Sequence, residues 1–146
     1  MLRIIKIYRS TASKTMKEIL DKLKSVVQAL EKEQGPILFF ALFLREDSLE
    51  RWDIVVSAPW LSSVERNAYQ IVISKIQAVL TSSELIQISR VVILDDTDPA
   101  VSFLQEVCPL TNGGYKETPQ DFLVDPLSEK FGFVIKKAYI LRCQKL

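Results

Sequence analysis

Apolar residues recur at helical spacing in two stretches of the chain. The first covers one face at steps of three and four positions: Met16, Ile19, Leu20, Leu23, Val26, Val27 and Leu30. We expect this helix to begin at Ser13 or Thr15, because Thr15 and Glu18 have capping-box spacing. Gly35-Pro36 should end it, since glycine accepts a left-handed cap and proline cannot continue the helical hydrogen bonding.

The second stretch lies in residues 63–80 and repeats the same spacing. Ser62 and Glu65 form another capping-box pattern at its start, and Thr81-Ser82-Ser83 should end it. The leader Leu2–Tyr8 alternates apolar and basic residues, so it fits either a short strand or an early helical turn. The pattern therefore predicts two long amphipathic helices and leaves the leader open.

Three other segments have the pattern of strands. Ile37–Leu44 is apolar on both alternating faces, which is typical of a central strand covered by helices on both sides. Trp52–Ala58 follows after a short polar loop, so the two should form an antiparallel hairpin. Ile88–Leu94 is a third strand, and Asp98-Pro99 then opens a short helix, with the aspartate as its cap.

The pattern weakens after Leu110. Phe122–Val124 is a candidate edge strand, and Phe131–Arg142 is the expected final strand, with Gly132 at a bulge. The element order is then α-β-β-α-β-α-β, with one further strand optional. We predict a single α/β domain over residues 1–146, with α+β as the alternative: one mixed sheet containing the hairpin, with about three helices packed on it.

Composition supports one globular domain. The chain has 146 residues, of which 48% are apolar and 25% charged. The longest apolar run, Ile37–Leu44, is too short to cross a bilayer, and no signal-peptide pattern is present. Cys108 and Cys143 lie beside apolar residues and are expected to be buried thiols rather than ligands. We therefore expect a soluble, cytoplasmic protein without a membrane partner.

Positive charge is concentrated near the start of the chain. Residues 1–34 hold eight Lys and Arg against four Asp and Glu, a net charge of +4. The basic side chains that could meet phosphates are Arg3, Lys6, Arg9, Lys14 and Lys17. A solvated helix face explains the same residues, and nucleic-acid binders usually have a stronger basic bias, so we do not expect nucleic acid as a partner.

Histidine is absent from the sequence. The chain therefore lacks the commonest general base, the commonest metal ligand and the usual partner of a nucleophilic serine or cysteine. The four glycines form neither a phosphate-binding loop nor a dinucleotide-binding motif. Any catalysis would have to use carboxylates, Lys, Arg, Tyr or Cys.

Three carboxylates are the candidate metal ligands. Asp95 and Asp96 directly follow a strand, and Asp53 lies near the start of another. Carboxylates gathered at strand ends can hold Mg²⁺. The alternative function is therefore a metal-dependent enzyme, or an inactive relative of one, acting on a nucleotide or phosphorylated substrate. This requires Asp53 and Asp95 to be close enough to share an ion; otherwise Asp95 and Asp96 form only a polar turn before the helix.

The leading hypothesis is a non-enzymatic protein-interaction or regulatory module that acts as a homo-oligomer, with a homodimer or another protein as its partner and with no catalytic residues and no cofactor. It rests on the many apolar residues of the chain and on the lack of a recognisable group of catalytic residues in the sequence. The candidate partner or ligand contacts are Trp52 and Trp60, with Arg45 and Arg51. Each tryptophan has the alternative role of covering the core at a strand end.

Overall fold

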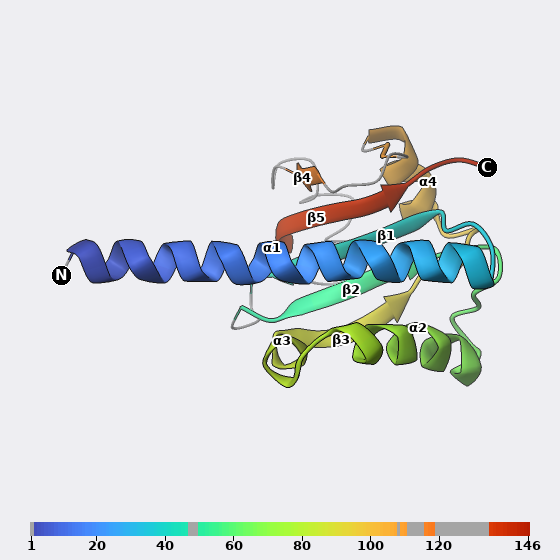
Figure 1. Cartoon of the computed structure of the whole chain (residues 1–146). Helices are drawn as coiled ribbons and strands as arrows, with labels where there is room; N and C mark the ends of the chain where they lie inside the picture. The colour runs from blue at the N-terminus through green and yellow to red at the C-terminus, as the bar shows by residue number, and fades with distance from the viewer. Residues whose placement is uncertain (1, 47–49, 108, 111–115, 119–134) are drawn as a thin grey trace.

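The computed structural model describes residues 2–46, 50–107, 109–110, 116–118 and 135–146; for residues 2–15, 107 and 116–118 it describes the backbone alone. The elements are α1 (Leu2–Glu33), β1 (Phe39–Arg45), β2 (Trp52–Ser57), α2 (Arg66–Val79), α3 (Ser82–Ile86), β3 (Ile88–Ile93), α4 (Pro99–Val107), β4 (Lys116–Thr118) and β5 (Ile135–Cys143). Figure 1 shows their arrangement around one sheet.

The described strands form one mixed sheet in the order β3-β2-β1-β5-β4. β1 pairs antiparallel with β2 and with β5, while β2 and β3 are parallel. The parallel pair needs a crossover, and α2 with α3 supplies it. The predicted hairpin, mixed sheet and order of the main elements are confirmed.

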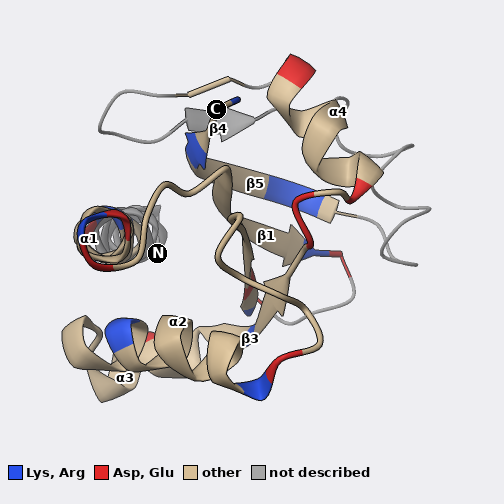
Figure 2. Cartoon of the chain, turned by 90° about the vertical axis from the view of Figure 1, so that its right-hand side faces the viewer, with Lys and Arg blue, Asp and Glu red and all other residues tan. Residues whose placement is uncertain are grey.

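β1 lies at the centre of the sheet, and both of its faces are buried. Phe40 and Leu42 pack in the cluster with α1 and α2. Phe39 and Phe43 pack on the opposite face with α4. Figure 2 shows the sheet between these two layers. The prediction that this strand is covered on both sides is therefore confirmed, and it explains why the strand carries no polar alternation.

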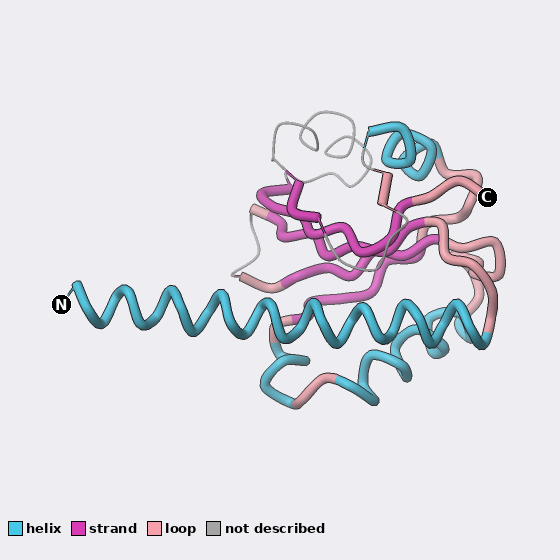
Figure 3. Tube along the Cα trace, turned by 45° about the horizontal axis from the view of Figure 1, so that its top comes forward, coloured by secondary structure: helices cyan, strands magenta, loops and turns pink. Residues whose placement is uncertain are grey.

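α1 differs from the expectation. The predicted start at Ser13 or Thr15 is wrong, because the helix runs without a break from Leu2, so Thr15 lies inside it and the leader is not a strand. The buried face from Ile19 to Leu30 packs on the sheet. Figures 1 and 3 show the N-terminal part of the helix continuing past the ends of the strands.

The C-terminal end of α1 follows the prediction. The Gln34 amide donates the last helical bond to the Leu30 carbonyl oxygen. Gly35 then takes a φ of 132°, a conformation that residues with a Cβ rarely adopt. The chain reverses there and enters β1.

The region around α2 corrects two expectations. α2 begins at Arg66, and its N-cap Glu65 makes no side-chain cap bond, so the predicted box at Ser62–Glu65 is not formed. The segment predicted only as a break contains α3, whose capping box joins Thr81 and Glu84. The start of α4 is as predicted, since Asp98 Oδ1 accepts a bond of 2.9 Å from the Ala100 amide.

The C-terminal region is described in part. β4 was not predicted, and β5 begins at Ile135. The predictions for Phe122–Val124 and Gly132 lie outside the described residues, and so does Cys108. Cys143 is buried, as expected. Among the described helices, none combines the length and hydropathy needed to cross a membrane.

Glu84 ties α3 to α1 and gives a pH-dependent prediction. It is only 4% exposed, and its Oε1 accepts a bond of 2.6 Å from Lys22 Nζ and one of 2.8 Å from the Thr81 amide. Burial raises the pKa of this carboxyl, but the hydrogen bonds from Lys22 and Thr81 outweigh burial, so its pKa is lowered overall. The ionised form is thus favoured by folding.

We expect Glu84→Gln to lower the free energy of unfolding by about 1–2 kcal/mol at pH 7. Because the folded pKa is depressed, this contribution is present above the ordinary carboxyl pKa and is lost as pH falls through the folded value. Urea denaturation at pH 7 and pH 3 should therefore show the gap closing on acidification. Glu65→Gln is the matched control, and an equal gap at both pH values contradicts the prediction.

Candidate functional site

The predicted site residues separate to opposite ends of the sheet. Arg45, Trp52 and Asp53 lie where β1 ends and β2 begins, and Arg51 directly precedes β2. Trp60, Asp95 and Asp96 follow the other ends of β2 and β3. We consider the proposed metal site first, then the end of the sheet that holds Trp52.

The three predicted metal ligands do not come together. Asp53 pairs with Arg90 in the parallel β2–β3 register, and Asp95 lies five residues beyond Arg90. At a rise of about 3.3 Å per residue, roughly 16 Å separates the two aspartates along the strands, too far for one ion to bridge. Over the described residues, no group of three or more Asp, Glu, Cys or His is placed to hold a metal. The shared Mg²⁺ site is therefore not formed.

Asp53 instead lies between two arginines. Its side chain is 1% exposed, and its Oδ2 lies 3.3 Å from Arg45 Nε and 3.2 Å from Arg90 Nε. Within the described part of the chain, neither carboxylate oxygen accepts a hydrogen bond, so these two ion pairs balance the buried charge. Two neighbouring guanidinium groups would repel a cation, and we assign this cluster a role in joining β1, β2 and β3.

Asp95 and Asp96 have different surroundings. The Asp95 carboxylate accepts bonds from Ser63, 3.0 Å from the amide and 2.8 Å from the hydroxyl. This fixes the loop before α2 against the end of β3. The Ser62 hydroxyl oxygen, predicted as a helix cap, accepts a bond of 3.4 Å from the Val64 amide instead. Asp96 is exposed. The alternative hypothesis, that Asp95 and Asp96 form a polar turn before the helix, accounts for both residues.

Trp60 closes the loop between α1 and β1. Its Nε1 donates to the carbonyl oxygens of Gly35 and Pro36, both at 3.0 Å. The half-buried ring also packs against the main core. These contacts describe a structural role for Trp60, at the far end from the other candidate contact residues.

A groove of about 650 Å³ lies where α1 leaves the sheet. We call it the end groove, and it combines apolar walls with a charged rim. Its lining residues are Met16, Leu44, Glu50, Arg51, Trp52, Ile86, Gln87, Lys136, Lys137 and Tyr139. Its volume is within the range of small-molecule sites. Two of the four predicted contact residues, Trp52 and Arg51, line it.

Aromatic rings form one wall of the end groove. The rings of Trp52 and Tyr139 lie 5.4 Å apart with an interplanar angle of 35°. Lys137 Nζ lies 5.2 Å from the centre of the Tyr139 ring, in cation–π range. Trp52 is largely buried, so it serves the core and the groove together. Arg51 is held at the rim, since it donates to the carbonyl oxygens of Ile86 and Ile88.

Sequence reasoning missed eight of the ten described lining residues, among them Ile86, Lys136, Lys137 and Tyr139. Lys136 and Lys137 interrupt the apolar alternation of the last strand, which is a signal of an exposed strand start. Ile86 belongs to the unpredicted α3 and is 69% exposed, which is unusual for an isoleucine. No local pattern places Tyr139 beside Trp52, because that contact depends on the β1–β5 pairing.

The end groove combines apolar surface with positive charge. Among its described lining residues, Glu50 is the one carboxylate and no nucleophile–base pair is present. Comparisons with protein-family models, curated proteins and solved structures found no match.

The Asp53 cluster gives a stability prediction. Asp53→Asn leaves Arg45 and Arg90 together without the buried negative charge between them. We expect a loss of about 3 kcal/mol in the free energy of unfolding by urea denaturation. Asp96→Asn, at an exposed position, should change it by less than about 0.5 kcal/mol. A loss at Asp53 as small as that at Asp96 would show that the two ion pairs contribute little.

Proposed function

We propose that the protein is a non-enzymatic interaction module that acts as a homodimer, and that the N-terminal part of α1 is its contact surface. The observation that carries the proposal is the length of α1 relative to the sheet it covers (Figure 1). The absence of histidine and of a metal-ligand cluster in the described residues leaves contact as the best-supported role.

The apolar face of α1 extends beyond the sheet in the sequence. Met16 packs against the core. Ile4, Tyr8 and Ala12 precede it at four-residue intervals, and such positions share one face of a continuous helix. The helix itself continues past the ends of the strands (Figure 3). Apolar positions at this spacing favour contact with another apolar surface, so a second helix of the same kind is a natural partner.

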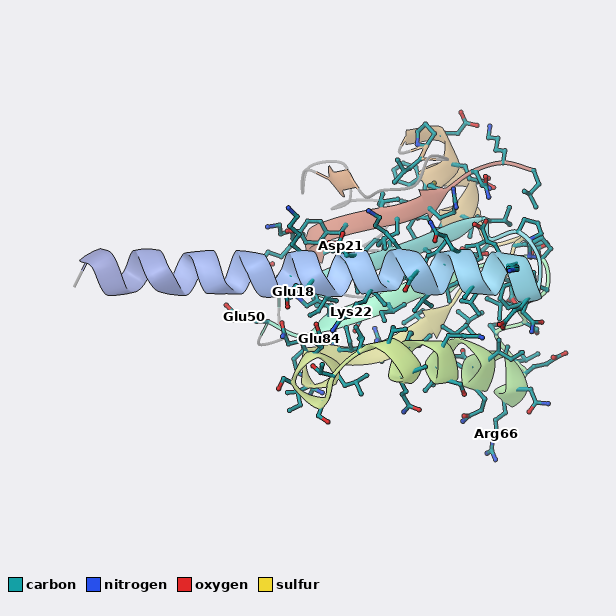
Figure 4. The ribbon with its side chains drawn as sticks, viewed as in Figure 1. Glu18, Asp21, Lys22, Glu50, Arg66 and Glu84 are labelled. Carbon is teal, nitrogen blue, oxygen red and sulfur yellow. The ribbon has the colours of Figure 1, made fainter. Side chains whose placement is uncertain are left out.

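The charge distribution favours an antiparallel pair. Residues 1–17 contain five basic and no acidic side chains, so parallel pairing would align like charges. Glu18 and Asp21 lie on α1 near the point where it leaves the sheet, with Glu50 close by (Figure 4), and Asp21 also lies 3.6 Å from Lys24. An antiparallel second copy brings its basic N-terminal turns toward these carboxylates. The opposite charges then support the register as well as the contact.

We place this module in the cytoplasm and without a cofactor. The cytoplasmic placement rests on the composition of the chain, which contains only two cysteines. The proposal needs no metal and no nucleotide, and nucleic acid is not its expected partner.

Light scattering tests the dimer. The wild-type chain should have a mass about twice the 16.7 kDa monomer, and Tyr8→Asp should reduce it to the monomer value, because a carboxylate enters the apolar contact face. Circular dichroism should show that Tyr8→Asp remains folded, since the sheet packs against later turns of α1.

Ser10→Asp is the matched control. It adds the same charge two positions away, on the other side of the helix, and should leave the dimer intact. A monomeric wild-type chain at about 100 μM, where contacts of only about −6 kcal/mol would already pair most chains, overturns the proposal. Equal effects of the two variants would also contradict it, because they would point to a general charge effect.

A further inference from the structure

We propose that the end groove binds a small anionic ligand with a planar apolar ring, such as an aromatic carboxylate or a nucleoside monophosphate. The inference does not require the dimer, because the aromatic and basic residues on which it rests lie on β2, β5 and the loop before β2. Met16 of α1 and Leu44 of β1 add aliphatic surface to the same groove.

The ring-binding part is the wall made by Trp52 and Tyr139. Leu44 and Met16 extend this wall with aliphatic surface. The tilted arrangement of the two rings leaves Tyr139 half-buried at the groove. A flat ring system placed against them would exchange water for aromatic contact, which contributes more than its buried area alone.

The anion-binding part is the rim. Among the lining residues that the structure describes, Arg51, Lys136 and Lys137 are basic and Glu50 is acidic. The two backbone bonds of Arg51 fix its guanidinium before any ligand arrives. A preorganised charged donor loses less entropy on binding than a mobile one. Lys137 lies over Tyr139, so the same ligand can reach a ring and a positive charge together.

The other candidate surfaces give weaker support for a ligand-binding site. A second, shallower hollow of about 520 Å³ lies between α1 and α2, and its charged lining residues Glu33 and Lys75 already pair with each other. The Asp53 cluster is closed by its own ion pairs. The end groove is the described cavity in which apolar wall and excess charge meet.

Calorimetry with three matched naphthalene compounds tests the inference. Naphthalene-2-carboxylate should bind about tenfold more tightly than 2-naphthalenemethanol, because one charged hydrogen bond is worth about that factor. The cationic 2-naphthalenemethylamine should bind still more weakly. Adenosine 5′-monophosphate forms a parallel arm: binding by it as well indicates a nucleotide-type ligand, and binding by the carboxylate alone indicates an aromatic acid, each consistent with the proposed class.

Variants locate the site. Lys136→Gln combined with Lys137→Gln should remove most of the preference for the carboxylate, about a tenfold loss, while Lys145→Gln at the exposed C-terminal end should not. In nuclear magnetic resonance spectra, the indole signal of Trp52 should shift on titration and that of Trp60 should not. Trp60→Phe assigns the two signals, since the chain has only two tryptophans.

The measurements are repeated in Tyr8→Asp, so that the outcome does not depend on whether the chain forms a dimer. Equal affinity for the three naphthalene compounds would overturn the inference, because it would show apolar adsorption alone. Absence of binding by both anionic probes, or a shift of Trp60 in place of Trp52, would overturn it too.

Discussion

The packing of α1 on the sheet is the constraint on which the rest of the structure depends. A helix of 32 residues is about 48 Å long, whereas the seven residues of β1 span about 24 Å. The sheet can therefore cover only part of the helix. Along that part, the buried face from Ile19 to Leu30 closes one side of β1, and α4 closes the other. A strand as apolar as β1 requires both covers.

The functional surfaces follow from this mismatch in length. Where α1 passes the end of the sheet, it leaves a corner bounded by Met16, the first residues of β2 and the start of β5. Polar residues at the starts of the strands lie next to apolar core residues at this corner. The end groove forms there, and acidic side chains lie beside it. At the opposite end, Trp60 and the bonds between Asp95 and Ser63 hold the loops closed, and the hollow there lies between α1 and α2.

The sequence predicts the strands and their pairing better than it predicts where the helices begin. The unbroken apolar run of β1 and the short loop to β2 are local signals, and both led to correct pairings. The predicted starts of α1 and α2 were wrong. A serine or threonine three residues before a glutamate has the spacing of a capping box whether or not the capping hydrogen bonds form. Thr15 lies inside a longer helix, while the Ser62 hydroxyl oxygen accepts from the Val64 amide in the loop before α2. Only tertiary contacts decide such cases.

The candidate site was predicted in part for the same reason. Trp52 and Arg51 were identified as contact residues, and both line the end groove. Asp53 was interpreted as a metal ligand because its two arginine neighbours lie on other strands, outside any local pattern. Tyr139 and Lys137 reach the groove only through the β1–β5 pairing.

Amide hydrogen exchange along α1 at several protein concentrations tests the central claim most directly. The account predicts that residues 19–30 are protected at every concentration, because the sheet covers them. Residues 2–14 should be protected only at concentrations where the second copy is bound, and should lose that protection on dilution. Residues 2–14 that exchange equally fast at all concentrations, or that stay protected at all of them, would contradict the account.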